Sequence, residues 1–243
     1  MIEADKICFN GSDNFIKAYL NNELIWEKNR YTPVSWIGNG NSGVWFDTTY
    51  HLTKNSRFVI SFQVMSDAAA KVFGFEDLFR SGYSGSTERE FLYRCWVHPY
   101  SSKDIRYLFD MGDDWGSTYR TWIKYTSDVV TVDCDMKNHI STATINGTTT
   151  TLSDDPITSW NKFEITQPTF GVFGYDRWRY DKHYQYEISQ NNTIRLFSLK
   201  IYEDGVLTKD WIPVLDMDNR PAMLDLVDMS YYYGTGGEFT YGE

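Results

Sequence analysis

The segment Gly174–Glu187 carries the densest combination of side chains suited to molecular contact. Aromatic rings alternate there with charged groups, in the run GYDRWRYDKHYQYE. Exposed rings cost hydration free energy unless something covers them, and aromatic residues with Arg dominate binding hot spots. We expect a contact surface formed by Tyr175, Arg177, Trp178, Arg179 and Tyr180. A protein is favoured over a sugar because Arg offers forked donors for carboxylates; the alternative is that half of the rings pack inward.

A second candidate is the segment DMGDDWGSTY, in which three carboxylates surround Gly112. Oxygen ligands of this kind bind Ca²⁺ in proteins, so Asp110, Asp113 and Asp114 are candidate calcium ligands. Trp115 follows them and could stack on a sugar. The segment lacks the closing Glu of an EF-hand, and the alternative is an ordinary polar loop between strands.

Two pairs of carboxylates have a spacing that could support glycoside hydrolysis. A retaining glycosidase needs two carboxylates about 5 Å apart, which residues i and i+2 on one face of a strand can supply. Asp133 and Asp135 form one such pair, and Glu88 and Glu90 form another. No further acid follows Asp135 at the spacing of a catalytic motif, and acidic pairs on the solvent face of a strand are common. We therefore expect no catalytic residues.

The histidine and cysteine residues do not suggest a metal centre. The four His residues are isolated and show neither an HxH nor an HExxH spacing, and the three Cys residues contain no CxxC. We expect reduced cysteines and no bound cofactor, with Ca²⁺ as the one ion for which candidate ligands exist. These residues are His51, His98, His139, His183, Cys8, Cys95 and Cys134.

Charge and hydropathy exclude several classes of partner. The net charge of −10 would repel a phosphate backbone, and no basic stripe offsets it, so nucleic acid is not an expected partner. No run approaches the roughly 18 apolar residues of a membrane span. The opening MIEADKIC has no apolar signal region. We expect synthesis in a cytoplasm without a signal peptide.

Short runs of β-branched and aromatic residues, separated by Gly, Asn, Asp and Ser, predict an all-β fold with many antiparallel strands. In the run RFVISFQV, apolar residues occupy every second position, which is typical of a strand in a β-sandwich. The segment Met65–Phe79 could form a helix or a pair of strands. The clearest strands are Arg57–Val64, Phe91–Val97, Ile105–Asp110, Tyr119–Tyr125, Val129–Asp135 and Thr142–Asn146.

Turn residues divide the strands. Asn146-Gly147 predicts a type I′ hairpin, because both residues accept positive φ. Asp204-Gly205 predicts another turn. Pro213 and Pro221 are expected to mark loops, because proline cannot donate a ladder hydrogen bond.

The segment Ile194–Glu243 resembles the closing part of laminin-G or concanavalin-like jelly rolls of tailed phages and their bacterial hosts. In these proteins a strand ending in an acidic-Gly turn leads to an aromatic-Ile-Pro-Val segment, an Asp-Leu-Val element and an aromatic strand with a Gly-rich turn. The matching positions are Phe197, Lys200, Ile201, Gly205, Asp210, Trp211, Ile212, Pro213, Val214, Leu224, Asp225, Tyr232, Gly234, Gly236, Phe239 and Gly242.

The opening FNGSDNFIKAYLNNELIWEK is similar to a short attachment module of phage tail and fibre proteins, with Asn21 in place of the usual Gly. The two resemblances imply a division into residues 1–30, an N-terminal attachment arm, and residues 31–243, a concanavalin- or laminin-G-like jelly-roll β-sandwich.

The resemblance implies a non-enzymatic structural protein of a phage virion: a fibre, a head decoration or a tail-associated protein. Its expected partners are other virion proteins, further copies of itself, with a trimer as the form of a fibre, and a glycan of the host surface. Its expected location is the virion. Two alternatives remain open, a bacterial carbohydrate-binding lectin domain and a glycoside hydrolase of jelly-roll fold.

Overall fold

The computed structural model describes residues 17–20, 23–27, 31–40, 44–53, 55–65, 76–84, 89–101, 104–111, 119–124, 126–138, 140–153, 169–176, 186–188 and 194–243. These residues form strands, turns and extended segments, and no helix occurs among them. Every strand pair is antiparallel, so the predicted all-β fold with antiparallel strands is confirmed.

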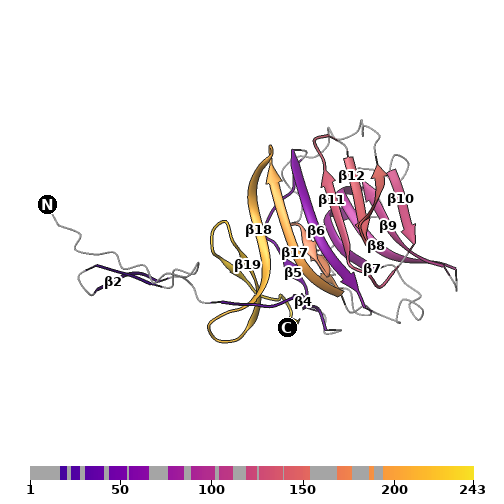
Figure 1. Cartoon of the computed structure of the whole chain (residues 1–243). Helices are drawn as coiled ribbons and strands as arrows, with labels where there is room; N and C mark the ends of the chain where they lie inside the picture. Colours follow the sequence, from indigo (N-terminus) through magenta and orange to yellow (C-terminus); the bar gives the residue numbers. More distant parts are fainter. Residues whose placement is uncertain are drawn as a thin grey trace.

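Most of the strands described in the C-terminal half of the chain belong to the larger sheet (Figure 1). Its main path runs from β13 through β12, β11, β6, β17, β18 and β19 to β20. Three further strands join it: β3 pairs with β18, and β4 pairs with both β17 and β21. In chain order the strands are β3 (Thr32–Pro33), β4 (Trp36–Gly38), β6 (Ser56–Val64), β11 (Val130–Asp135), β12 (Ile140–Ile145), β13 (Thr148–Ser153), β17 (Ile194–Glu203), β18 (Val206–Leu215), β19 (Pro221–Asp225), β20 (Tyr231–Tyr232) and β21 (Thr240–Gly242).

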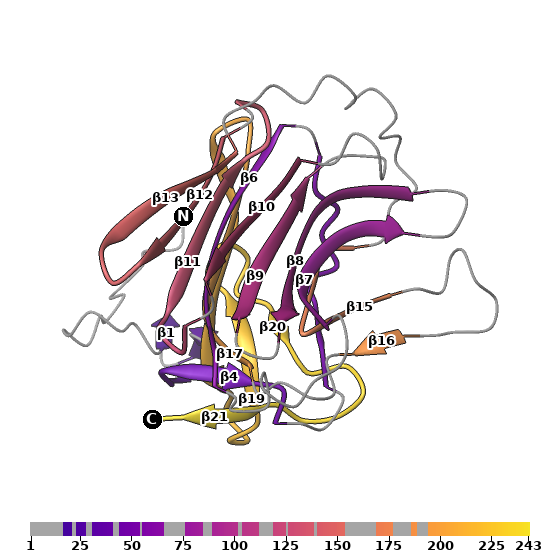
Figure 2. The same ribbon diagram turned by 90° about the vertical axis from the view of Figure 1, so that its right-hand side faces the viewer.

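The smaller sheet has the order β10, β9, β8, β7, β14, β5 and forms a second layer (Figure 2). Its strands are β5 (Phe46–Asp47), β7 (Glu76–Ser84), β8 (Arg89–Ser101), β9 (Asp104–Met111), β10 (Tyr119–Lys124) and β14 (Gly171–Val172). Two separate pairs complete the set: β1 (Lys17–Leu20) with β2 (Glu23–Glu27), and β15 (Gly174–Asp176) with β16 (Tyr186–Ile188).

One hydrophobic core lies between the two layers. In β6 the side chains of Phe58, Ile60 and Phe62 are buried and alternate with partly exposed residues, as the period of two predicts. Phe62 meets Tyr107 of the smaller sheet edge to face, with ring centroids 5.8 Å apart. The sheets are therefore joined by apolar contact between their facing sides.

The two predicted hairpin turns are present. Asn146 and Gly147 have φ of 49° and 75°, and Asp204 and Gly205 have φ of 49° and 82°. Two consecutive residues at positive φ define the type I′ geometry, which suits the twist of the flanking strands.

The expectation is wrong for Pro213, which lies inside β18. Pro221 begins β19 directly after the turn of residues 216–220 and so marks the end of a loop. Pairing of β18 with β17 reaches only as far as Trp211. Beyond Trp211, on the same side of β18, the carbonyl of Pro213 accepts a 3.1 Å hydrogen bond from the N–H of Val34. Because the N–H and C=O of one strand residue point to the same side, the missing donor of Pro213 leaves the ladder with β19 intact.

The segment Met65–Phe79 is described only at its two ends. Met65 follows β6, and the last residues of the segment, from Glu76, belong to β7. The predicted choice between a helix and strands falls mainly on residues 66–75, outside the described residues.

Candidate functional site

The residues predicted to contact a partner lie mostly outside the described part of the chain. Tyr175 belongs to β15 and pairs through its backbone with Glu187, but its side chain is not described. Arg177, Trp178, Arg179 and Tyr180 all lie outside the described residues. This contact surface stays a prediction.

The predicted calcium ligands also fall on residues whose side chains are not described. Asp110 lies in β9 opposite Arg120, with its side chain undescribed. Asp113, Asp114 and Trp115 lie outside the described residues. Among the residues that are described, no group of three His, Cys, Asp or Glu side chains is arranged to hold a metal ion.

The carboxylates of Asp133 and Asp135 are each engaged by a different neighbour. Arg57 donates from Nε to Oδ1 of Asp133 at 2.8 Å and from Nη2 to Oδ2 at 2.6 Å. Asp135 accepts from the backbone N–H of Asn138 at 3.0 Å and from its Nδ2 at 2.8 Å. The first pair joins β6 to β11, and the second closes the turn after β11. Of the other predicted pair, Glu88 is outside the described residues and Glu90 has an undescribed side chain in β8.

The described residues bring together a different surface, on the outer face of β18 and β19. Register places Ile212 opposite Leu224 and Val214 opposite Ala222. Directly opposite residues share a face of a sheet, and this face is turned away from the main core, which receives the alternate residues. We call this second apolar group the junction cluster. Its buried members are Val214, Ala222 and Leu224, and its partly buried members are Tyr31, Ile212, Met229 and Tyr231.

The junction cluster holds the root of the N-terminal segment. Tyr31 packs against the cluster, and the next residues form β3, in which Pro33 pairs with Val214. The chain is held further by the N–H of Ser35, which donates to the carbonyl of Gly242 at 2.8 Å. The point at which the N-terminal segment leaves the larger sheet is therefore fixed by strand pairing and by apolar packing.

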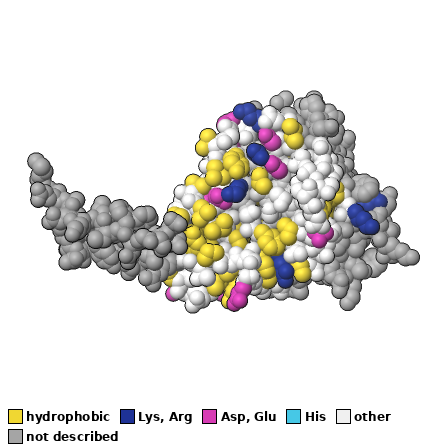
Figure 3. Space-filling view, viewed as in Figure 1, with side chains coloured by type: hydrophobic (Ala, Val, Ile, Leu, Met, Phe, Trp, Pro, Cys, Tyr) yellow, Lys and Arg dark blue, Asp and Glu magenta, His cyan; other side chains and the backbone are white. Residues whose placement is uncertain are grey.

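An arginine and two tyrosines extend the surface beside the junction cluster. The rings of Tyr231 and Tyr233 are stacked, with centroids 6.3 Å apart and an interplanar angle of 19°. The guanidinium of Arg220 lies 4.8 Å from the centroid of Tyr233, a cation–π distance. Tyr233 is 41% exposed, and Met217 in the same turn as Arg220 is 66% exposed. Figure 3 shows hydrophobic side chains gathered over the side of the body that carries β18 and β19.

The buried carboxylate of Asp216 orients the side chains of Arg220 and Tyr233. Its Oδ2 accepts hydrogen bonds from Nε of Arg220 at 2.9 Å and from the hydroxyl of Tyr233 at 2.7 Å, and Oδ1 accepts from the backbone N–H groups of Asp218 and Arg220. Burial would raise the pKa of this carboxyl, but the hydrogen bonds outweigh burial and lower the pKa to about 2. Burial and the bond to Asp216 raise the pKa of Tyr233 to about 12.

A second charged group joins the strands on the inner side. The Nζ of Lys209 lies 2.8 Å from Oδ2 of Asp225 and 2.6 Å from Oδ2 of Asp228. Asp225 is fully buried, and its Oδ1 accepts from the backbone N–H groups of Asp210 and Val227. Burial lowers the pKa of Lys209, but the two carboxylates outweigh burial and raise the pKa above its usual range. The ion pairs hold β18 to β19 and to the turn that follows.

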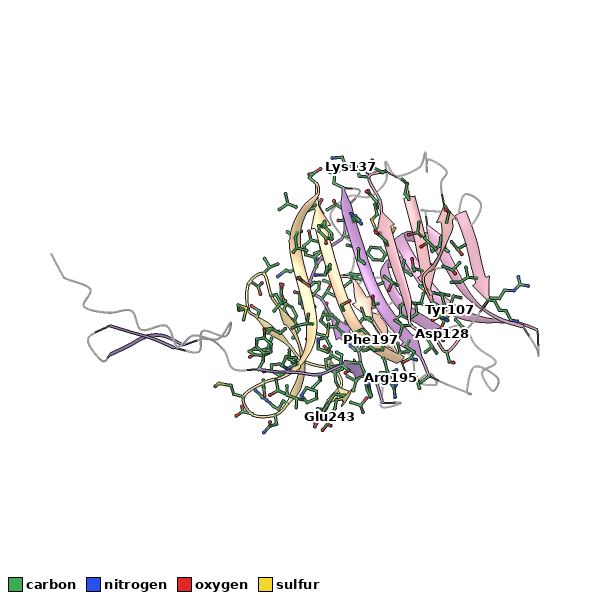
Figure 4. All side chains as sticks on the ribbon, viewed as in Figure 1. Tyr107, Asp128, Lys137, Arg195, Phe197 and Glu243 are labelled. Carbon is green, nitrogen blue, oxygen red and sulfur yellow. The ribbon has the colours of Figure 1, made fainter. Side chains whose placement is uncertain are left out.

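Trp36 and Arg195 form a further contact near the C-terminus, at the end of the body opposite Lys137 (Figure 4). The guanidinium of Arg195 lies 4.3 Å from the ring of Trp36. A Cβ on Gly242 would lie 2.2 Å from Nε1 of Trp36, so only glycine lets β21 pass beneath this indole. The contact secures β4 between β17 and β21.

The sequence analysis missed the outer surface because it assigned no separate directions to the side chains of Tyr231, Tyr232 and Tyr233. Tyr232 does face inward, where it meets Trp211 and Phe46, but its two neighbours face outward. The period of two in a strand was the available signal. The spacing of Asp216 and Arg220 in the DMDNR turn was a second one.

The arrangement is suited to contact with another molecule. Arg, Tyr and Met side chains surround a small apolar centre, which is the composition of protein interfaces. In the part of the chain that the structure describes, no helix is long and apolar enough to cross a membrane. No protein-family model matches the sequence, and the comparison with curated proteins finds no significant match.

Proposed function

We propose that this chain is a non-enzymatic structural protein of a tailed-phage particle: a fibre, a decoration or a tail-associated protein. Residues 1–30 attach it to neighbouring proteins, and residues 31–243 form a jelly-roll β-sandwich of the concanavalin and laminin-G kind. The resemblance of the closing segment Ile194–Glu243 supports this fold. So does the placement of β17, β18, β19 and β20 in one antiparallel sheet that shares its core with a second sheet.

One observation carries the proposal: β1 and β2 form a two-stranded sheet of their own. Among the described strands, neither pairs with any strand outside this hairpin. A two-stranded hairpin is at best marginally stable in water and needs further strands or packing. A neighbouring protein would supply that packing, which favours an assembly role over that of a domain that only binds a ligand.

The junction cluster supports the same role. Because Tyr31 and β3 are fixed to the larger sheet, the hairpin starts from a defined point on the body. The exposed surface of Arg220, Tyr233 and Met217 lies in the turn between β18 and β19 and directly after β20, next to the strands that hold Tyr31 and β3. A neighbour that bound the hairpin would therefore meet an arginine and aromatic surface beside it, and we propose protein contact there.

The test is incorporation into particles. Phage particles from the strain that carries the gene are separated on a density gradient, and the protein is detected in the fractions by a C-terminal tag. We expect the full chain in the particle fraction. A chain lacking residues 1–30 should keep its far-ultraviolet circular dichroism and its melting temperature but stay in the soluble fraction.

A matched control is Val206→Lys, at an exposed position in the β17–β18 hairpin, which should enter particles as the native chain does. Absence of the native chain from particles would overturn the proposal, and so would normal incorporation of the chain that lacks residues 1–30. Cleavage of a polysaccharide by the purified chain would favour the glycoside hydrolase instead.

A further inference from the structure

The strand β13 ends the larger sheet, and among the described strands it pairs with β12 alone. Figure 2 shows the β12–β13 hairpin at the outer edge of its layer. An edge strand presents backbone N–H and C=O groups to any strand that approaches. Natural proteins block such edges with Lys, Pro, bulges or short length.

The β12–β13 hairpin has no charge to block its edge. From Ile140 to Ser153 the sequence reads ISTATINGTTTTLS, without Asp, Glu, Lys, Arg or Pro, in a chain of which 23% is charged. The residues Thr148, Thr149, Thr150 and Thr151 are all exposed. Threonine favours extended strands, and Thr148 to Thr151 pair with β12 in regular register, before the irregularity between Ser141 and Thr142. Among the described strands, none pairs with the outer side of β13.

The turn determines which backbone groups face outward. In a two-residue type I′ hairpin, the residues that flank the turn, Ile145 and Thr148, form a hydrogen-bonded pair. Hydrogen-bonded and non-hydrogen-bonded pairs alternate in an antiparallel ladder. Thr150, opposite Ala143, is thus bonded to β12, while Thr149 and Thr151 direct their N–H and C=O groups away from it.

We propose that β13 pairs with β13 of a second copy of this chain, antiparallel and around a two-fold axis. Thr149 lies opposite Thr151 of the second copy, and the two Thr150 residues face each other at the axis. Each pair of Thr149 with Thr151 exchanges both backbone hydrogen bonds. The larger sheets of the two copies then form one continuous sheet.

Two features of the chain favour a second copy over another partner. The edge is self-complementary, because reversing the Thr149–Thr151 segment leaves the same residues and the same outward groups, and Thr–Thr pairs stabilise facing strands. The chain also carries a net charge of −10, so two copies repel each other in general, and an uncharged hairpin is where they can approach.

This inference names a partner for the assembly role proposed above, but it uses β13 and not residues 1–30. The two proposals can therefore fail separately. A chain lacking residues 1–30 should dimerise as the full chain does, and loss of its dimerisation would overturn the inference without affecting the role of the arm in particles.

The experiment is sedimentation velocity on the full chain over roughly 1 to 100 µM. We expect a monomer–dimer equilibrium. Thr150→Lys places two ammonium groups at the axis and should weaken dimerisation about tenfold or more, because like charges directly opposite destabilise a strand pair. Thr149→Pro should do the same, because it removes an outward donor and leaves the ladder with β12 intact. Val206→Lys, which adds the same charge in the β17–β18 hairpin, should dimerise normally.

A mixing experiment tests the register. Thr150→Lys and Thr150→Glu should each dimerise more weakly than the native chain when alone and should associate more tightly when mixed, because opposite charges then meet at the axis. A native chain that stays monomeric over the whole concentration range would overturn the inference. So would Lys and Glu variants that each dimerise as tightly as the native chain, or that associate no more tightly when mixed than alone.

Discussion

The hydroxyl of Tyr233 donates a 2.7 Å hydrogen bond to Oδ2 of Asp216 and so ties the segment after β20 to the turn between β18 and β19. The same oxygen accepts from Arg220, whose guanidinium covers the Tyr233 ring. One buried carboxylate thus orients both the cation and the ring of the outer surface.

Replacing this carboxylate should destabilise the protein. In the native chain, the two carboxylate oxygens of Asp216 accept hydrogen bonds from Asp218, Arg220 and Tyr233. The asparagine of Asp216→Asn has only one side-chain oxygen, so at least one of these donors loses its partner. We expect the free energy of unfolding to fall by about 1–3 kcal/mol, measured by urea denaturation. Asp218→Asn is the control, because the Asp218 side chain is mostly exposed and forms only a longer ion pair, 3.4 Å, with Arg220. This substitution should change the free energy of unfolding little. Equal effects of the two substitutions would contradict the prediction.

The pKa of Asp216 sets an acid limit on stability. Because its pKa in the folded chain is about 2, against an ordinary 3.8, its ionised form stabilises the fold. This contribution is complete above about pH 4 and is lost as the pH falls towards 2. Melting temperatures measured between pH 2 and pH 7 should show a smaller acid decrease in Asp216→Asn than in the native chain. An identical acid decrease would rule out this role for Asp216.

Tyr233 sets a corresponding limit at high pH. Its pKa in the folded chain is about 12, above the ordinary 10, so its neutral form stabilises the fold. The contribution is present below about pH 10 and is lost as the pH rises towards 12. Tyr233→Phe should make stability less dependent on pH in this window. The measurement is denaturant unfolding at pH 9 and pH 11, and an unchanged dependence would argue against the prediction.

Replacing Lys209 should lower the free energy of unfolding, because the carboxylate of Asp225, which is fully buried, then loses its cationic partner. Breaking a buried ion pair costs roughly 3–5 kcal/mol, and the low end applies to Lys209→Met because 18% of the Lys209 side chain stays exposed. Adding Asp225→Asn should recover part of the loss by removing the stranded charge. Lys137→Met, which breaks an exposed pair with Asp204, should have little effect on urea midpoints. A small effect of Lys209→Met would show that the pair contributes little.

Gly234 is required where the chain returns to the core. A Cβ at this position would lie 2.5 Å from Val44 and 2.7 Å from the carbonyl oxygen of Gly237, which cannot move freely. Gly234→Ala should cost about 1–3 kcal/mol, as overpacking does. Gly237→Ala meets the Val44 side chain alone, at 2.8 Å, and should cost less. Thermal unfolding of both variants checks the order, and the reverse order would contradict it.

The thiols of Cys95 and Cys134 should be unreactive in the folded chain. Neither forms a disulfide and both are fully buried, and burial raises the pKa of Cys134, which leaves little thiolate to react. Iodoacetamide labelling followed by peptide mapping should modify both in urea and neither in native buffer. Native labelling at either cysteine would contradict the burial of that strand.

Local patterns predicted much of the fold. The alternation in β6 and the Asn146-Gly147 turn are short-range signals, since the side-chain direction along a strand and the φ of a turn depend on neighbouring residues. Pro213 misled because the tolerance of β18 for this proline depends on β3, which comes from Thr32 and Pro33 near the other end of the sequence. The candidate surface was missed for the same reason: Asp216 and Tyr233 meet across two turns.

Sequence patterns alone were enough to establish that this protein is built from antiparallel strands, which residues of β6 face inward and where two hairpins turn. Each of these follows from a period or a turn preference within a few residues. Only long-range contacts place β3 and β4 between β17 and β18, Tyr31 against the junction cluster, and Arg220 over Tyr233. Those contacts depend on strand order and register, which sum many weak interactions between distant segments, and no local pattern records them.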